Sequence, residues 1–173
     1  MTSFNLCTFT IHFELMQIRK IKKEDNTQIA KVIRDVFIEL DAPKVGTAYA
    51  DPILDTLFEV YRKPNSIYFV VENDGKVLGG GGIGPLENGP ADVCELQKMY
   101  FSPEIRGLGL AEQIVLKCLN FAKAEGFSKC YLETLPFMKA AQRVYVKAGF
   151  TYLSEPMGGT GHTSCDVWMI KEL

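Results

Sequence analysis

The fold of this chain is decided by residues 95–115, which read ELQKMYFSPEIRGLGLAEQIV. The first half is rich in apolar and aromatic residues and is typical of a strand that ends near Pro103. Gly107 and Gly109 then precede an apolar stripe at helical spacing that begins at Ala111. Glycines at such a turn allow close backbone approach, and N–H groups at a helix start favour an anion. The stretch therefore predicts a strand, a turn and a helix, with a candidate anion site.

Two common phosphate-binding motifs do not fit this turn. The P-loop pattern GxxxxGK[ST] is missing, and Glu112 stands where a dinucleotide fingerprint would need its third glycine. What remains is Arg106-x-x-Gly109-x-Ala111. Local spacing alone leaves two interpretations open, a diphosphate site or a tight turn without a ligand.

Working outward from this turn, the patterning predicts one α/β domain. The expected elements are a strand at 16–21, a helix with apolar positions from 29 to 40, a helix opening at Asp51-Pro52, strands at 66–72, 76–86 and 93–103, a helix at 107–125, a strand at 129–135, a helix at 138–148, and strands at 150–155 and 165–172. The order β-α-α-β-β-β-α-β-α-β-β predicts a single mixed, mostly antiparallel sheet with helices on both faces. Four glycines at 79–82 indicate a bulge or a close backbone approach within a strand.

Composition excludes several classes of protein. The chain has 173 residues, is 47% hydrophobic and 23% charged, and has a formal charge of −2. No stretch is strongly basic, so nucleic acid is not expected as a partner. No apolar run approaches the roughly 20 residues that cross a bilayer, so no membrane span is expected. Five cysteines without a CxxC pair favour the reducing cytoplasm over a disulfide framework.

The first fifteen residues alternate between apolar and polar types in CTFTIHFEL. This segment is interpreted either as an extra edge strand, which could pair two copies into a homodimer, or as an over-long start before Met16. The second interpretation is favoured because MQIRKI already resembles the first strand of a domain. The domain proper is then expected at 16–173.

The central stretch resembles the acetyl-CoA site of the GNAT N-acetyltransferase superfamily. The loop of that family is [Q/R]-x-x-G-x-[G/A], and Arg106, Gly109 and Ala111 match it. A second resemblance lies in AAQRVYVKAGF, where an alanine, Ala141, is followed four residues later by Tyr145 and then by Gly-Phe. The order of the expected elements also matches from residue 16 to the C-terminus.

This resemblance implies acetyl-CoA as the co-substrate. The strand backbone would pair with the pantetheine arm, the Met99 N–H would stabilise the oxyanion, and the N–H groups of residues 106–111 would hold the pyrophosphate. The implied cofactor-binding residues are Met99, Tyr100, Phe101, Arg106, Gly107, Leu108, Gly109, Leu110, Ala111 and Ala141.

Tyr145 is the candidate general acid, since a phenol with a pKa of about 10 can protonate a departing thiolate. Its other interpretation is a residue of the apolar stripe of its helix. Many relatives carry an asparagine three residues before the alanine, where this chain has Met138.

Glu95 is the candidate general base, because some relatives carry a catalytic glutamate eleven residues before the arginine. An amine must lose a proton before it attacks a thioester. Strand alternation predicts that Glu95, Gln97, Met99 and Phe101 share one face. A lone charge at this position is either a surface residue or a site residue, and the second interpretation is favoured.

Other polar residues are weaker candidates. Glu133 and Thr134 lie in the next strand, and His162 with Cys165 lies in the glycine-rich segment 157–165. No further ligands accompany His162 and Cys165, so no metal is expected. A cysteine nucleophile is not needed for direct attack by an amine.

The sequence thus predicts a cytoplasmic N-acetyltransferase that moves an acetyl group from acetyl-CoA to a primary amine of a small acceptor. The competing prediction is a non-catalytic acyl-CoA-binding sensor or interaction module, in which Glu95 and Tyr145 would be dispensable.

Overall fold

The computed structural model describes residues 16–161 and 163–173. The segment at 1–15, predicted as an extra strand or an over-long start, lies outside the described residues, and so does His162. Four described cysteines are free thiols, and three of them are buried as the apolar pattern predicts, namely Cys94, Cys118 and Cys130.

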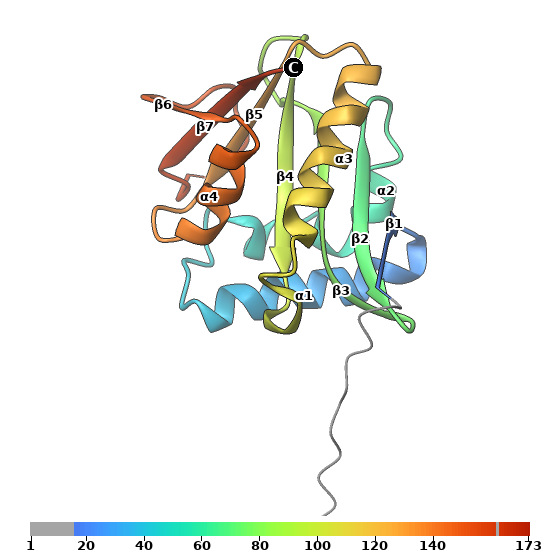
Figure 1. The fold of residues 1–173 in the computed structure, drawn as a ribbon. Coiled ribbons are helices and arrows are strands. Elements are labelled where there is room, and N and C mark those ends of the chain that lie inside the picture. Colours follow the sequence, from blue (N-terminus) through green and yellow to red (C-terminus); the bar gives the residue numbers. More distant parts are fainter. Residues whose placement is uncertain (1–15, 162) are drawn as a thin grey trace, which may run out of the picture.

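One seven-stranded sheet forms the centre of the described chain (Figure 1). Its strands in chain order are β1 (Gln17–Lys20), β2 (Ile67–Asn73), β3 (Lys76–Pro85), β4 (Val93–Phe101), β5 (Lys129–Thr134), β6 (Thr151–Leu153) and β7 (Val167–Glu172). They lie in the order β1-β2-β3-β4-β5-β7-β6, and only β4 and β5 pair in parallel. The predicted mixed, mostly antiparallel sheet is confirmed.

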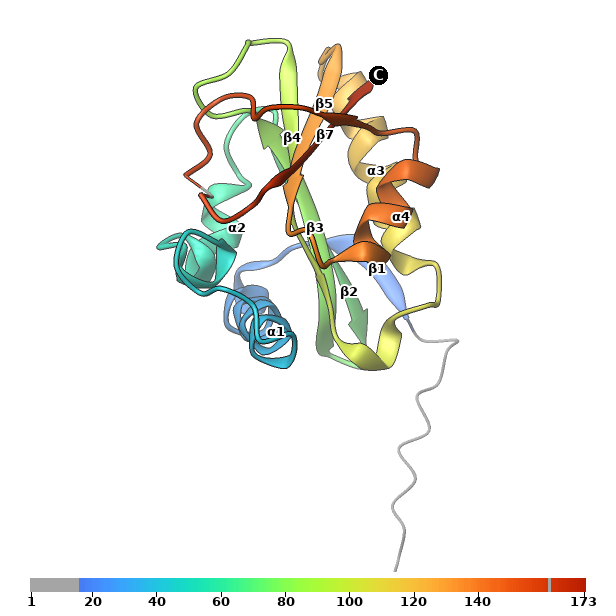
Figure 2. The same cartoon turned by 90° about the vertical axis from the view of Figure 1, so that its left-hand side faces the viewer.

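Helices cover both faces of this sheet, as predicted. Figure 2 shows α1 (Asn26–Glu39) and α2 (Leu57–Val60) on one side, with α3 (Leu110–Ala124) and α4 (Lys139–Lys147) on the other. Each helix pair encloses its own hydrophobic core. Ile114 and Cys118 are completely buried on the α3 side, while Ile29 and Ile33 are completely buried on the α1 side.

The second predicted helix begins later than the sequence suggests. Instead of opening at Asp51, the chain makes short 3-10 turns at Ala48–Ala50 and Leu54–Thr56 before α2 begins at Leu57. The Asp51 carboxylate accepts a hydrogen bond from the Ile53 N–H at 3.1 Å, which stabilises a local turn. Asp51 thus lies outside a helix, where its carboxylate contacts Lys98 of the site described below.

The two parallel strands at the centre are paired over only a short length. Val93, Cys94 and Glu95 of β4 pair with residues 129–131 of β5, and within the described chain no pairing between these strands continues beyond Glu95. In Figure 1 the two strands separate toward their carboxyl ends. The rest of β4 therefore lacks a partner strand, among the described residues, on the side that faces β5.

A β-bulge interrupts β4 beside this opening. Gly80 pairs with Tyr100 and Gly82 pairs with Gln97, so Lys98 and Met99 both lie opposite Gly81. Lys98 adopts a left-handed backbone with φ of 51°. A bulge of this kind adds a residue and shifts which side chains share a face.

The predicted alternation along β4 is therefore wrong. Met99 and Phe101 pack into the core on the α3 side, whereas Gln97 contacts Tyr61 on the α2 side. Glu95 hydrogen-bonds Gln97 and faces the same side as it. The inserted residue separates the candidate base from the strand segment that lies beside α3.

The glycine run in β3 makes room for large side chains on both faces, which confirms the predicted close approach. A Cβ on Gly81 would clash with the Met99 sulfur, and one on Gly82 would lie 2.5 Å from Cδ2 of Tyr68 and 2.7 Å from Cε1 of Tyr61. Real Cβ atoms do not approach other atoms this closely. These two positions therefore need glycine so that Met99 and Tyr61 can pack.

Candidate active site

A cavity of about 420 Å³ lies between the end of β4, the start of α3 and the start of α4. Nine of the ten predicted cofactor-binding residues line it: Met99, Tyr100, Phe101, Arg106, Gly107, Gly109, Leu110, Ala111 and Ala141. Leu108, the tenth, does not line this cavity and packs against the hydrophobic core instead. The fold thus brings Ala141 of α4 against residues 99–111, a continuous stretch that runs from β4 through the turn into α3.

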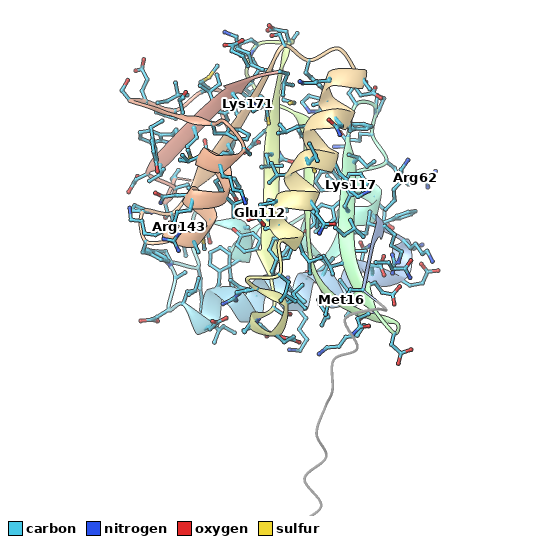
Figure 3. All side chains as sticks on the ribbon, viewed as in Figure 1. Met16, Arg62, Glu112, Lys117, Arg143 and Lys171 are labelled. Atoms are coloured by element: carbon cyan, nitrogen blue, oxygen red, sulfur yellow. The ribbon has the colours of Figure 1, made fainter. Side chains whose placement is uncertain are left out.

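The turn before α3 offers a row of backbone donors to this cavity. Gly107 and Gly109 have φ of 77° and 74°, a conformation that glycine adopts without strain. Among the described residues, no group accepts a hydrogen bond from the backbone N–H groups of residues 107–112. Glu112, labelled in Figure 3, lies in the first turn of the helix. Six N–H groups thus lie at the positive end of a 15-residue helix, an arrangement that favours an anion.

Arg106 contributes to this turn differently from the prediction. Its backbone N–H is already bonded to the Pro103 carbonyl at 3.2 Å, so it is not available to a ligand. The side chain closes the turn, because Nε donates to the Phe101 carbonyl at 2.9 Å. The guanidinium also meets the Glu39 carboxylate at the end of α1 through two contacts of 2.7 Å. The donors that face the cavity therefore begin at Gly107.

A second, smaller cavity of about 40 Å³ lies on the side of the sheet that carries α2. It is lined by Glu95, Gln97, Glu133, Thr134 and Cys165, among others. Five residues line both cavities: Met99, Tyr100, Met138, Ala141 and Tyr145. The two cavities thus meet where β4 and β5 separate, so molecules bound on either side would approach each other there.

Tyr145 lies at this meeting point. It is 6% exposed and packs against the Phe150 ring in the core on the α3 side, so it is part of the apolar stripe of its helix. It also lines both cavities. Burial raises the pKa of Tyr145 well above that of an ordinary phenol. The hydroxyl therefore carries its proton at neutral pH, as a proton donor must.

Glu95 is buried at 3% exposure on the other side of the opening. Its Oε2 atom accepts a hydrogen bond of 2.6 Å from Nε2 of Gln97. Oε1 of Gln97 accepts one of 2.8 Å from the Tyr61 hydroxyl. Sequence reasoning did not find Tyr61, although the glycine at 82 that accommodates its ring was a usable signal.

The bulge between Glu95 and Met99 is held from two directions. The Lys98 ammonium, with a side chain only 4% exposed, contacts the Asp51 carboxylate at 2.6 Å. The Lys98 carbonyl accepts a hydrogen bond of 2.9 Å from the Tyr68 hydroxyl. Nothing in the sequence pattern signals this arrangement, because lysine is uncommon both in buried strands and in the left-handed region.

The loop that precedes β7 covers the smaller cavity. Thr160 donates to Oε2 of Glu133 at 2.8 Å, and the Tyr131 hydroxyl donates to Oε1 at 2.8 Å. Cys165 is half-buried, and desolvation together with Glu133 and Glu95 raises the pKa of its thiol to about 12. A thiol with such a pKa is not a nucleophile at neutral pH, in agreement with the expected direct attack.

Gln142 fixes α4 at the opening and was missed by sequence reasoning. Its buried Nε2 donates to the carbonyls of Leu135 and Pro136 at 3.0 and 3.2 Å, and its Oε1 accepts from Tyr152. These bonds tie the helix that carries Tyr145 to the end of β5. The one signal available was a polar residue inside the apolar stripe of α4.

The sheet opens between two parallel strands, with a row of backbone N–H groups on one face and a buried carboxylate on the other. This arrangement suits group transfer between two bound molecules. The chain belongs to the acetyltransferase (GNAT) family, whose model matches residues 33–150. An uncharacterised N-acetyltransferase of Escherichia coli K12, YjgM, is 48% identical over 158 residues, which cover 90% of this chain and 94% of the relative. The predicted family is therefore confirmed.

Solved structures share the fold. The acetyltransferase from Streptococcus agalactiae aligns with a TM-score of 0.80 at 16% identity, over 93% of this chain and all of the other chain. The yncA acetyltransferase from Salmonella typhimurium, solved with acetyl-CoA, aligns with a TM-score of 0.74 at 18% identity, over 92% of this chain and 94% of the other. Within the described part of the chain, no helix has the length and apolar character needed to cross a membrane.

Proposed function

We propose that this protein transfers the acetyl group of acetyl-CoA to a primary amine of a small acceptor by direct attack in a ternary complex. The observation that carries the proposal is the meeting of two cavities at Tyr145 and Met99. One cavity offers six backbone donors for a pyrophosphate, and the other contains a buried carboxylate. Family membership and relatives solved with acetyl-CoA support the choice of donor.

The larger cavity fits the donor molecule in two respects. The N–H groups of residues 107–112 would bind the pyrophosphate, with no side chain between them and the cavity at the two glycines. The edge of β4 beyond Glu95, where the described pairing with β5 ends, would pair with the amides of the pantetheine arm. The thioester would then lie near the bulge, where the Met99 N–H would donate to the carbonyl oxygen.

Each proton has a proposed carrier. Glu95 would remove a proton from the ammonium group of the acceptor, directly or through water, so that the nitrogen lone pair can attack the thioester carbon. A C–N bond forms, the nitrogen of the tetrahedral adduct gives its second proton to solvent, and the C–S bond breaks. Tyr145 would protonate the departing thiolate and regain its proton from solvent. The products are the N-acetylated amine, CoA and one proton.

The experiment measures CoA release as free thiol while a panel of primary amines is offered with acetyl-CoA. We expect thiol release that depends on one class of amine. We also expect Glu95→Gln and Tyr145→Phe each to lower kcat by about 10²-fold or more, because general acid and base groups contribute about that much.

The same experiment separates the enzyme from a binding module. Tight CoA binding without thiol release from any amine would favour the acyl-CoA sensor over the transferase. Normal kcat in both variants would refute the assigned proton carriers but leave the transferase activity intact.

A further inference from the structure

We propose that Tyr61 is a positioning residue for the candidate base: its hydroxyl fixes the Gln97 amide so that the amide N–H faces Glu95 and holds that carboxylate toward the acceptor. This inference rests on the proposed function, because it concerns the reaction in which Glu95 takes part. It adds two residues, Tyr61 and Gln97, that act through Glu95.

The geometry of the three groups is directional. The Tyr61 hydroxyl lies 2.8 Å from Oε1 of Gln97, and Nε2 of Gln97 lies 2.6 Å from Oε2 of Glu95. If the amide were turned over, its oxygen would face the carboxylate oxygen and repel it. The carboxylate therefore selects this amide orientation, and the Tyr61 hydroxyl, by donating to Oε1, holds the amide in it.

Tyr61 is itself rigidly held. It follows the last residue of α2 and is 6% exposed. Its ring lies over Gly82 and against the Tyr68 ring, with the ring centroids 5.0 Å apart. Burial raises the pKa of Tyr61 well above its usual value, so the hydroxyl remains a donor throughout the physiological range.

This arrangement also explains why β3 needs glycine at position 82. A Cβ there would lie 2.5 Å from the Tyr68 ring and 2.7 Å from the Tyr61 ring, so both rings would have to shift, and the Tyr61 hydroxyl would move relative to Gln97. A contact between the end of α2 and β3 thus determines how a carboxylate on β4 is oriented. Residues that are held rigidly and hydrogen-bond to a catalytic group keep that group in its productive geometry.

The test compares steady-state kinetics of the wild type, Tyr61→Phe and Tyr49→Phe. Tyr61→Phe keeps the ring and removes only the hydroxyl, and Tyr49 provides a matched control because its ring packs against Phe37 outside both cavities. We expect Tyr61→Phe to lower kcat between about 10- and 100-fold, as misplacement of a catalytic group does. KM for acetyl-CoA should stay within about twofold, which shows that the donor side is intact. Tyr49→Phe should behave as the wild type.

A double variant distinguishes a role through Glu95 from general damage. In the Glu95→Gln background, adding Tyr61→Phe should cause no further loss of kcat, because the group that Tyr61 positions is already gone. Two results would overturn this inference and leave the proposed function standing. One is a double variant in which the two losses of kcat multiply, and the other is a normal kcat in Tyr61→Phe. Failure of the wild type to acetylate any amine would overturn the proposed function and this inference together.

Discussion

The guanidinium of Arg106 and the carboxylate of Glu39 face each other through two N–O contacts of 2.7 Å, and this pair joins the end of α1 to the turn that precedes α3. Hydrogen bonds from Arg106 lower the pKa of Glu39, so the pair is ionised at neutral pH. Both side chains are partly exposed, at 37% and 40%. The pair therefore bears mainly on the shape of the turn and little on global stability.

Replacing Arg106 with alanine should weaken CoA binding. An exposed ion pair contributes up to about 1 kcal/mol, which corresponds to a rise in Kd of up to about fivefold. Isothermal titration with CoA measures this directly. The melting temperature should fall by no more than about 4 °C.

Arg34 offers a matched control for that variant. It forms a similar two-contact pair with Asp55, at 2.8 and 2.6 Å, on the other face of the sheet from the anion-binding turn. Arg34→Ala should leave the Kd for CoA unchanged. Equal losses of affinity in both variants would mean that the Arg106 pair has no particular effect on the turn.

Gly109→Val should abolish CoA binding while the domain stays folded. The backbone there is left-handed, and a Cβ would meet nothing within 4 Å in the protein itself. The added side chain would therefore project into the region where the pyrophosphate is proposed to bind. Titration with CoA and thermal unfolding measure the two effects separately.

Gly126→Val controls for the backbone strain in that experiment. Gly126 follows the opposite end of α3 and has φ of 87°, and a Cβ added there would likewise meet nothing within 4 Å. Its replacement should cost a similar amount of stability without changing CoA affinity. If Gly109→Val also bound CoA normally, the turn would be only a structural connection.

Lys98→Met should lower both stability and kcat. Removing one partner of a buried ion pair commonly costs about 3–5 kcal/mol, and the melting temperature should therefore fall by roughly 6–20 °C. Adding Asp51→Asn should recover part of the stability, since the buried carboxylate is then replaced by a neutral amide. The kcat of the double variant should remain low, because the bulge has lost its lysine contact. Full recovery of kcat would show that the pair serves stability alone.

The pH dependence of kcat tests the assignment of Tyr145. Because burial raises the pKa of this phenol, its protonated form persists at alkaline pH and is lost only above the ordinary value of about 10. Deprotonation of Tyr145 should therefore cause no decline in kcat below about pH 10. An alkaline decline in that range which disappears in Tyr145→Phe would show that Tyr145 titrates there, and would contradict the raised pKa.

Much of the fold could be predicted because it follows from local patterns. Apolar patterning in β2 and helical spacing in α1 and α3 indicated the right element types, and the order of elements indicated the right class of sheet. The start of α2 could not be predicted, since Asp51 both stabilises a local turn and pairs with Lys98 through space. The Ile53 N–H bonds one carboxylate oxygen and Lys98 bonds the other, and the contact with Lys98 leaves no trace in the local pattern.

The candidate site could be predicted only where it depends on backbone chemistry. Gly107 and Gly109 indicate left-handed turns, and the structure places both at the cavity. The glycines at 79–82 indicated a bulge, but not that its extra residue lies on the neighbouring strand at Lys98, held there by Asp51 and Tyr68 from distant segments. Long-range contacts of this kind decide which face of β4 each side chain occupies, and sequence periodicity cannot supply them.

The most direct test of the central claim is to quantify the N-acetylated amine and the free CoA thiol in one reaction, using the best acceptor from the amine panel. Direct transfer predicts equal amounts of both products at every time point, no acetyl adduct on the protein, and no thiol release when the amine is omitted. Thiol release without acetylated amine, or an acetyl group that accumulates on Cys165, would contradict acetyl transfer from acetyl-CoA to an amine in a ternary complex.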